Sequence, residues 1–100
     1  MIDRLTIPHD QIVVFCQKHH IRRLSFFGSV LRDDFRADSD IDVLVEFQRD
    51  HTPGLITLAG MEIELSQILG RQADMRTPAE LSRYFRQEVI DHARVQYEQG

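Results

Sequence analysis

The 100-residue sequence has a single cysteine and no long apolar run, and each scarcity excludes a class of protein. Cys16 cannot form an internal disulfide, which favours a reducing compartment. The longest apolar runs, such as residues 12–16 and 41–47, are far too short to cross a bilayer. No basic segment followed by an apolar stretch marks a secretory signal. We therefore expect a soluble, cytoplasmic protein with no membrane partner.

An excess of positive charge is also missing. The 16 acidic and 12 basic residues give a net charge of −4, and both signs are interspersed along the chain. A protein that holds a nucleic-acid duplex through its phosphates is usually basic. We therefore expect no stable duplex binding, and a clustered acidic site that holds a cation fits the charge balance better.

Internal repeats, low-complexity segments and zinc-ligand spacings are absent as well. None of the five histidines stands at the usual Cys/His spacing of a zinc site. Hydrophobic residues make up 42% and charged residues 28% of the chain, which is ordinary globular composition. Length and composition together predict a single domain over residues 1–100.

Helical and strand patterns alternate along the chain. Apolar residues at helical spacing predict helices over residues 8–19 and 55–69, the second ended by Gly70. On the first of these, Cys16 lies on the apolar face and should be buried. Apolar, aromatic and β-branched residues predict strands over residues 23–27, 40–47 and 72–76. The order favours an α/β (α+β) fold, a short mixed sheet of about three strands flanked by helices.

The last quarter of the chain predicts a long final helix. Thr77-Pro78-Ala79-Glu80 is typical of a helix start, with Thr77 as N-cap and Pro78 in the first turn. Apolar residues then recur at helical spacing, at Leu81, Phe85, Val89, Ala93 and Tyr97. We also expect the phenylalanines to fill the core rather than to stack on a base, namely Phe26, Phe27, Phe35, Phe47 and Phe85.

Asp40 and Asp42 form the first candidate site. At positions i and i+2 of a strand, their side chains point to the same face, roughly 6.5 to 7 Å apart. Two like charges this close repel, and a divalent cation between them removes the repulsion. Carboxylate oxygens are the ligands that Mg²⁺ prefers, together with substrate phosphates. An isolated Asp-x-Asp can equally be a solvated strand start.

Gly28-Ser29 forms the second candidate site, between a strand and a turn or short helix. Glycine allows close approach to a ligand, and N–H groups at a helix start favour phosphate. A Gly-Ser turn alone is usually structural. The combination of a strand, Gly-Ser, ten residues and Asp-x-Asp on a second strand is far more specific, because it places a phosphate cradle beside a metal site.

Phe27-Gly28-Ser29, ten residues, and then Asp40-Ile41-Asp42 resemble the signature of the DNA polymerase beta nucleotidyltransferase superfamily. The length and layout resemble its smallest members, the minimal nucleotidyltransferases. The resemblance implies that Gly28 and Ser29 hold the phosphates of a nucleotide and that Asp40 and Asp42 bind two Mg²⁺ ions. It implies a third catalytic and metal-binding carboxylate on a later strand, for which Asp74 is the matching candidate.

Arg32 lies three residues after Ser29, where many family members also have arginine. It either contacts a phosphate or pairs with Asp33 or Asp34. At Leu31 and Asp33 the sequence departs from the small residues that many members carry. Asp33 adds a negative charge near the phosphate site, which bears on nucleotide affinity.

The resemblance implies an Mg²⁺-dependent enzyme that transfers a nucleoside monophosphate, AMP from ATP, to an acceptor hydroxyl. Minimal nucleotidyltransferases are typically antitoxins, paired with a ribonuclease toxin of the higher eukaryotes and prokaryotes nucleotide-binding (HEPN) domain type, and some add AMP to a toxin tyrosine. We expect this partner and role. Two alternatives stay open: a catalytically silent antitoxin that neutralises its toxin by contact, and a small-molecule nucleotidyltransferase.

Overall fold

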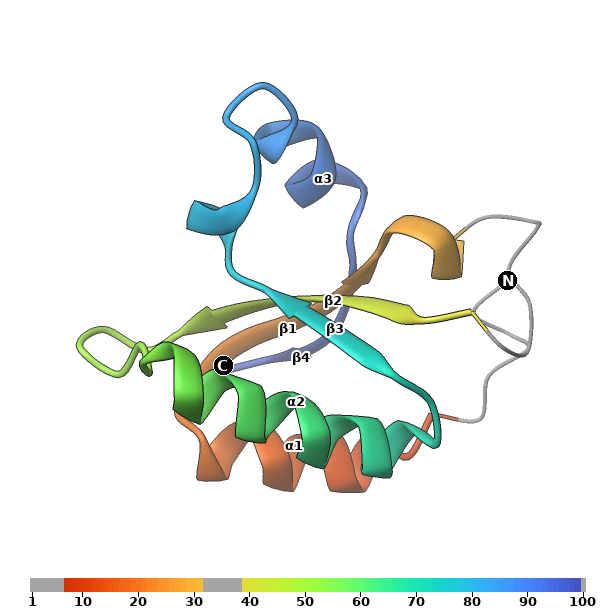
Figure 1. Ribbon diagram of the computed structural model, residues 1–100, viewed down its shortest axis with the longest axis vertical. Coiled ribbons are helices and arrows are strands. Elements are labelled where there is room, and N and C mark those ends of the chain that lie inside the picture. The colour runs from red at the N-terminus through yellow and green to blue at the C-terminus, as the bar shows by residue number, and fades with distance from the viewer. Residues whose placement is uncertain (1–6, 32–38, 100) are drawn as a thin grey trace.

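Residues 7–31 and 39–99 are described in a computed structural model of the chain. The elements follow in the order α1 (His9–Lys18), β1 (Ile21–Phe27), the 3₁₀ turn η2 (Gly28–Leu31), β2 (Ile41–Phe47), α2 (Leu55–Leu69), β3 (Ala73–Arg76), the 3₁₀ turn η3 (Pro78–Glu80), α3 (Arg86–His92) and β4 (Arg94–Glu98). The strands form one mixed sheet in the order β3-β2-β1-β4 (Figure 1). β2 and β3 run parallel, and β1 is antiparallel to both β2 and β4.

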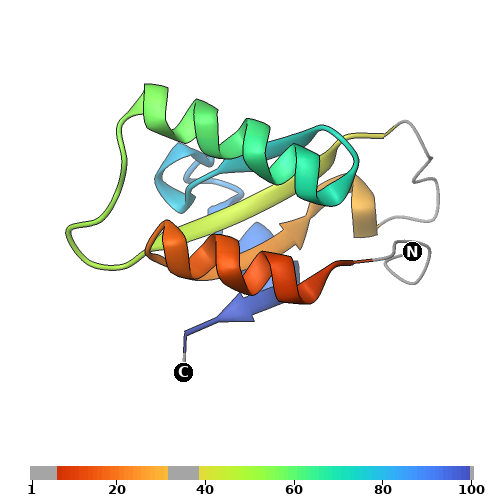
Figure 2. The same cartoon turned by 90° about the horizontal axis from the view of Figure 1, so that it is seen from below.

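Two helices cover one face of this sheet. Figure 1 shows α1 and α2 below the strands and α3 above them, and Figure 2, seen from below, shows α1 and α2 side by side in front of the sheet. The core lies between the helices and the sheet and includes Phe15 of α1, Leu65 of α2, Phe26 of β1 and Val43 of β2. The predicted α/β fold of a sheet flanked by helices is therefore confirmed, with four strands where we expected about three.

Local sequence signals place most of these elements correctly. The helix predicted over residues 55–69 is α2, and Gly70 ends it with a left-handed backbone (φ +69°). Cys16 is fully buried, as the apolar face of α1 predicts. Burial raises the pKa of its thiol to about 12, because the thiolate loses its hydration inside the core.

The long final helix is the clearest error of prediction. The chain forms η3, a loop, the short helix α3 and then β4, whose Tyr97 pairs with Leu24 of β1. Val95 and Tyr97 fit a strand of period two, and only Tyr97 also fits the helical spacing. Pairing with the edge of β1 decides between the two readings, because tertiary hydrogen bonds outweigh weak local propensity.

Of the helix start expected at residues 77–80, only the single turn η3 forms. Glu80 accepts hydrogen bonds from the Thr77 backbone N–H at 3.0 Å and from the Thr77 hydroxyl at 3.1 Å. Arg86 then donates to the carbonyls of Pro78 at 2.7 Å and Leu81 at 3.1 Å. These bonds satisfy carbonyls that a continuing helix would have used, so the helix ends after one turn.

No helix in the described part of the chain is both long enough and apolar enough to span a bilayer.

Candidate active site

Gly28 marks the turn at which β1 gives way to η2. Its φ is +70°, a left-handed conformation that glycine adopts without strain. A Cβ atom at this position would overlap Oδ2 of Asp42. Glycine is therefore required here for its backbone and for its size, and the turn lies directly against the Asp42 carboxylate.

The other residues expected to hold phosphate follow Gly28 in sequence. Ser29 is the second residue of η2, so the Gly-Ser pair begins the short helical segment and does not precede it as expected. Leu31 is half-buried and packs against the core, which explains the apolar residue at this position. Arg32 and Asp33 lie outside the described residues.

The sheet brings two of the three predicted carboxylates together. Asp42 of β2 pairs in register with Asp74 of the parallel strand β3. Their strand neighbours, including Val43 and Met75, are buried under α1 and α2. Because side chains alternate along a strand, Asp42 and Asp74 point to the opposite face, the side on which α3 lies.

Asp40 lies just before β2, two residues from Asp42, and is exposed. The three predicted carboxylates thus come from two adjacent strands at one end of the sheet.

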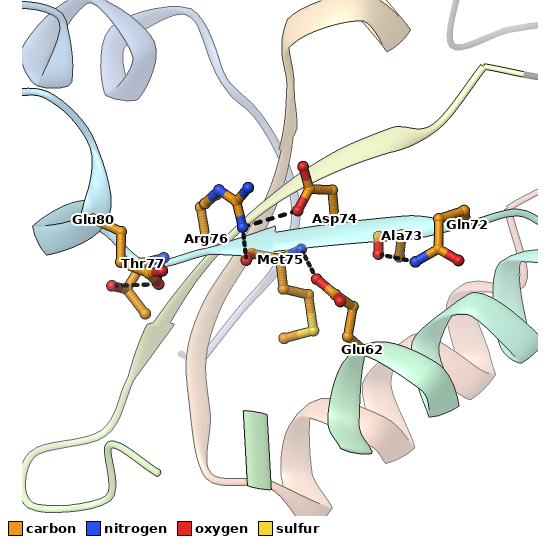
Figure 3. Close-up of polar contacts among 8 residues, drawn as sticks. All are labelled: Glu62, Gln72, Ala73, Asp74, Met75, Arg76, Thr77 and Glu80. Carbon is orange, nitrogen blue, oxygen red and sulfur yellow. Dashed lines mark hydrogen bonds and ion pairs between the residues drawn. The ribbon is translucent and has the colours of Figure 1, made fainter. Parts of the chain in front are cut away.

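Asp74 is already engaged by a cation of its own strand. Its Oδ1 lies 2.9 Å from Nη1 of Arg76, and both side chains are partly exposed (Figure 3). Within the described ranges, no group of three His, Cys, Asp or Glu side chains is placed to hold a metal ion. Adjacent strands therefore bring the predicted metal ligands near one another without yet directing all of them at one point.

Two polar side chains of α2 satisfy the backbone of β3 on either side of Asp74. The Met75 N–H donates to Oε2 of Glu62 at 2.7 Å, and the Ala73 N–H donates to Oγ of Ser66 at 2.8 Å. Figure 3 shows Glu62 reaching from the helix to β3, while Asp74 projects from the other face of the strand. The helix thereby holds the outer edge of a four-residue strand in place, and with it the backbone of Asp74.

A cavity of about 570 Å³ opens beside Gly28 and Asp42. The sheet and η2 line one side of it, with Phe27 and Leu31 next to these two residues. The other side is formed by residues around and within α3, namely Phe85, Glu88, Val89 and His92. This volume is within the range of small-molecule sites, so the candidate phosphate cradle opens into a ligand-sized pocket.

Sequence reasoning missed the α3 side of this pocket. It assigned Phe85 to the core, but the side chain is 62% exposed and lines the cavity. The error follows from the mistaken long helix, which would have turned this face toward the sheet. The alternation of Val95 and Tyr97 was the available signal, because a strand there requires the preceding helix to be short.

Comparison with known proteins identifies the family. Residues 10–96 match the family model for the nucleotidyltransferase domain. A Methanocaldococcus jannaschii protein, to which protein adenylyltransferase activity is provisionally ascribed, is 31% identical over 83 residues, which make up 83% of this chain and 87% of that protein.

Solved structures agree with this family. A chain described provisionally as a minimal nucleotidyltransferase is 32% identical, with a TM-score of 0.69 and 85% of each chain covered. A chain from a Shewanella oneidensis complex, described as a tri-AMPylated HEPN toxin with its MNT antitoxin, shares the fold at 18% identity. Its TM-score is 0.66, with 91% of this chain and 70% of that chain covered. The chain, with its Gly-Ser turn beside paired strand carboxylates, belongs to the nucleotidyltransferase domain family and is a nucleotidyltransferase of the minimal type.

Proposed function

We propose that this chain transfers AMP from ATP to a tyrosine hydroxyl of a HEPN-domain toxin and thereby acts as its antitoxin in the cytoplasm. The observation that carries the proposal is the register of Asp42 with Asp74 directly beside the Gly28 turn. This arrangement sets an anionic metal-binding surface against a glycine turn that a phosphate can approach closely.

The phosphate-binding role belongs to the Gly28-Ser29 turn. The backbone of η2 starts a short helical segment at Gly28, and N–H groups at such a start can donate to phosphate oxygens. Arg32 follows this segment and would add a guanidinium to the phosphate contacts. The turn positions the nucleotide. The reacting α-phosphate is then served by the three carboxylates, Asp40, Asp42 and Asp74.

The donor set suits Mg²⁺ chemically, since all three proposed ligands, Asp40, Asp42 and Asp74, offer carboxylate oxygens. Mg²⁺ bound here would neutralise negative charge at the α-phosphate and at the leaving pyrophosphate. Asp74 serves the attacking hydroxyl, either by holding it through a cation or by accepting its proton. For this role the Asp74 carboxylate must leave Arg76, its partner at 2.9 Å.

Relatives support the acceptor and the partner. The Methanocaldococcus jannaschii relative carries the description of a protein adenylyltransferase, and the Shewanella oneidensis complex pairs an MNT antitoxin with an AMPylated HEPN toxin.

A contact-only antitoxin is the second candidate, and the Asp74–Arg76 ion pair favours it. An ion pair that persists would hold the third carboxylate away from the other two and leave the site silent. Transfer and contact-only binding therefore make opposite predictions about the partner's mass.

The test measures AMP on the partner protein. The tagged chain is purified with its co-purifying HEPN protein, incubated with ATP and Mg²⁺, and both chains are weighed by intact mass spectrometry. We expect added AMP units on the HEPN chain, mapped to tyrosine, which disappear without Mg²⁺ and with the double substitution Asp40→Asn plus Asp42→Asn.

A matched control removes the same two charges elsewhere. Asp10 and Asp50 are exposed, and Asp50 has a positive φ that asparagine also tolerates. The variant Asp10→Asn plus Asp50→Asn should transfer AMP normally. Full transfer by the Asp40/Asp42 double variant would refute the site, and a stable, neutralised complex without any mass change would establish the contact-only reading.

A further inference from the structure

The pocket beside the candidate site is larger than phosphate binding requires, and its far side has a different chemical character. Phe27 and Leu31 line it from the sheet side, and Phe85 and Val89 line it from the α3 side. Glu88 and His92 add polar groups on α3. Apolar walls with a few polar groups are typical of sites for flat, weakly polar ring systems.

A hydrogen bond fixes which nitrogen of His92 carries its proton. His92 Nδ1 lies 2.8 Å from the backbone carbonyl of Glu88, one turn earlier on α3. A carbonyl oxygen only accepts hydrogen bonds, so Nδ1 must be the donor. In the neutral ring Nε2 then has no proton and presents a lone pair, on the edge of the ring away from the helix backbone.

We propose that the α3 side of this pocket binds the nucleobase and that His92 Nε2 selects a purine that carries an amino group at C6. The proposal rests on the nucleotidyl transfer proposed above and adds to it the choice of base. The 6-amino group of adenine donates a hydrogen bond to this lone pair. Guanine presents a carbonyl oxygen at the same position, so two acceptors would face each other and the contact is lost.

Glu88 reinforces the same preference. Its ionised carboxylate is also only an acceptor, and it lines the same pocket as His92. Both polar side chains of this wall thus favour a donor on the ligand and disfavour the guanine carbonyl. The apolar residues Phe85 and Val89 contact the ring without distinguishing one purine from another.

Calorimetric titration tests the selection of the base. ATP, GTP and purine riboside triphosphate, which lacks the 6-amino group, are titrated into the chain with Mg²⁺ at pH 8.5 and without an acceptor protein. We expect ATP to bind about fivefold to tenfold more tightly than the purine analogue, as one uncharged hydrogen bond allows. His92→Ala should weaken ATP binding toward the level of the analogue, keep only the share of the preference that Glu88 contributes, and leave the affinity of the analogue unchanged.

Three controls isolate the His92 contact. His9→Ala removes an exposed histidine at the start of α1 and should change nothing. His92→Gln keeps an acceptor oxygen and should restore part of the preference for ATP. Glu88→Gln measures the share that the carboxylate contributes to the same preference.

A nuclear magnetic resonance measurement checks the tautomer independently of nucleotide binding. Two-bond ¹H–¹⁵N spectra at pH 8.5 should show His92 protonated at Nδ1, and protonation at Nε2 would overturn the proposal. Equal affinity of the wild-type chain for ATP and the purine analogue would also overturn it while nucleotide binding itself stands. Binding of no nucleotide at all would instead refute the proposed function, and the base site with it.

Discussion

At the scale of single residues, the proposed site includes a carboxylate with two possible partners. Asp74 pairs in register with Asp42 and is bonded to Arg76 at 2.9 Å. The ion pair is partly exposed, so water screens it and it contributes little free energy. A bound cation can therefore displace Arg76 at small cost.

Asp74→Asn should separate chemistry from binding. We expect the rate of AMP transfer to fall about 100-fold or more, because the amide neither accepts the proton nor neutralises a cation. The nucleotide affinity should change by less than about threefold, because the substitution leaves the proposed phosphate contacts at the Gly28 turn in place. Single-turnover kinetics and nucleotide titration measure the two quantities. Equal losses in both would mean that Asp74 is a binding residue.

Gly28→Ala should destabilise the fold as well as the site. The added methyl group overlaps Asp42 Oδ2, and alanine at φ +70° costs about 1–2 kcal/mol of unfolding free energy. Urea denaturation measures this change. Gly60→Ala is the matched control, because Gly60 lies in α2 with open space around it. This variant should raise the free energy of unfolding by about 0.5–1 kcal/mol. An unchanged free energy of unfolding for Gly28→Ala would show that the turn can relax.

At the scale of elements, α2 supports the proposed site from outside the pocket, since none of its residues is among those that line the cavity. It packs its apolar face on the core and presents Glu62 and Ser66 to the outer edge of β3. A strand of four residues has few hydrogen bonds of its own, so these two bonds weigh heavily in its placement. Glu62 is thus a positioning residue for Asp74.

Glu62→Ala should cost stability and transfer together. The Met75 N–H loses its acceptor, which costs about 1–2 kcal/mol of unfolding free energy. The maximal transfer rate should fall while the KM for ATP changes little, because β3 carries Asp74 and the Gly28 turn is untouched. Steady-state kinetics checks this split. A KM effect with an unchanged rate would contradict the positioning role.

Glu64, on the same helix, gives a prediction on pH. Its carboxylate contacts Lys18 Nζ at 2.8 Å and His19 Nε2 at 2.9 Å, and the hydrogen bond from Lys18, then that with His19, lowers the pKa of Glu64 in the folded protein. Because its folded-state pKa is lowered, ionised Glu64 stabilises the fold at pH values above its unfolded-state pKa. This stabilisation is lost as the pH falls through the folded-state pKa. Glu64→Gln should therefore cost up to about 1 kcal/mol at pH 7 and less at pH 3.

Urea unfolding curves at the two pH values measure this difference. Transfer activity at pH 7 should not change, since Glu64 joins α1 to α2 on the face of the sheet away from Asp42 and Asp74. A stability cost that is the same at both pH values would exclude the ionic contribution.

At the scale of the whole molecule, one core between the helices and the sheet holds both strands of the site. The reactivity of Cys16 measures how tightly this core stays closed, because the thiol is fully buried and its pKa is about 12. Only the thiolate reacts, so a disulfide reagent at pH 8 should modify the folded chain roughly a thousandfold more slowly than the chain unfolded in guanidinium. Rapid labelling of the native chain would show that α1 opens without global unfolding.

Local sequence was sufficient for the elements whose signals are themselves local. The helical periodicity and Gly70 predicted α2, and the Phe27-Gly28-Ser29 and Asp40-Ile41-Asp42 segments pointed to the family. Asp74 was also named from sequence as a candidate, although nothing in the sequence shows that β3 lies parallel to β2. Phe85 was misassigned to the core because helical spacing cannot distinguish a long helix from a short helix and a strand.

The sequence by itself determined the α/β class, the Gly-Ser turn and the paired aspartates, because backbone preference and side-chain chemistry at these positions act over a few residues. Only the tertiary structure decided that Asp42 meets Asp74, that Arg76 holds Asp74, and that α3 lines a pocket with Phe85 and His92. These contacts join segments distant in the sequence, and strand pairing with burial selects them from many local possibilities.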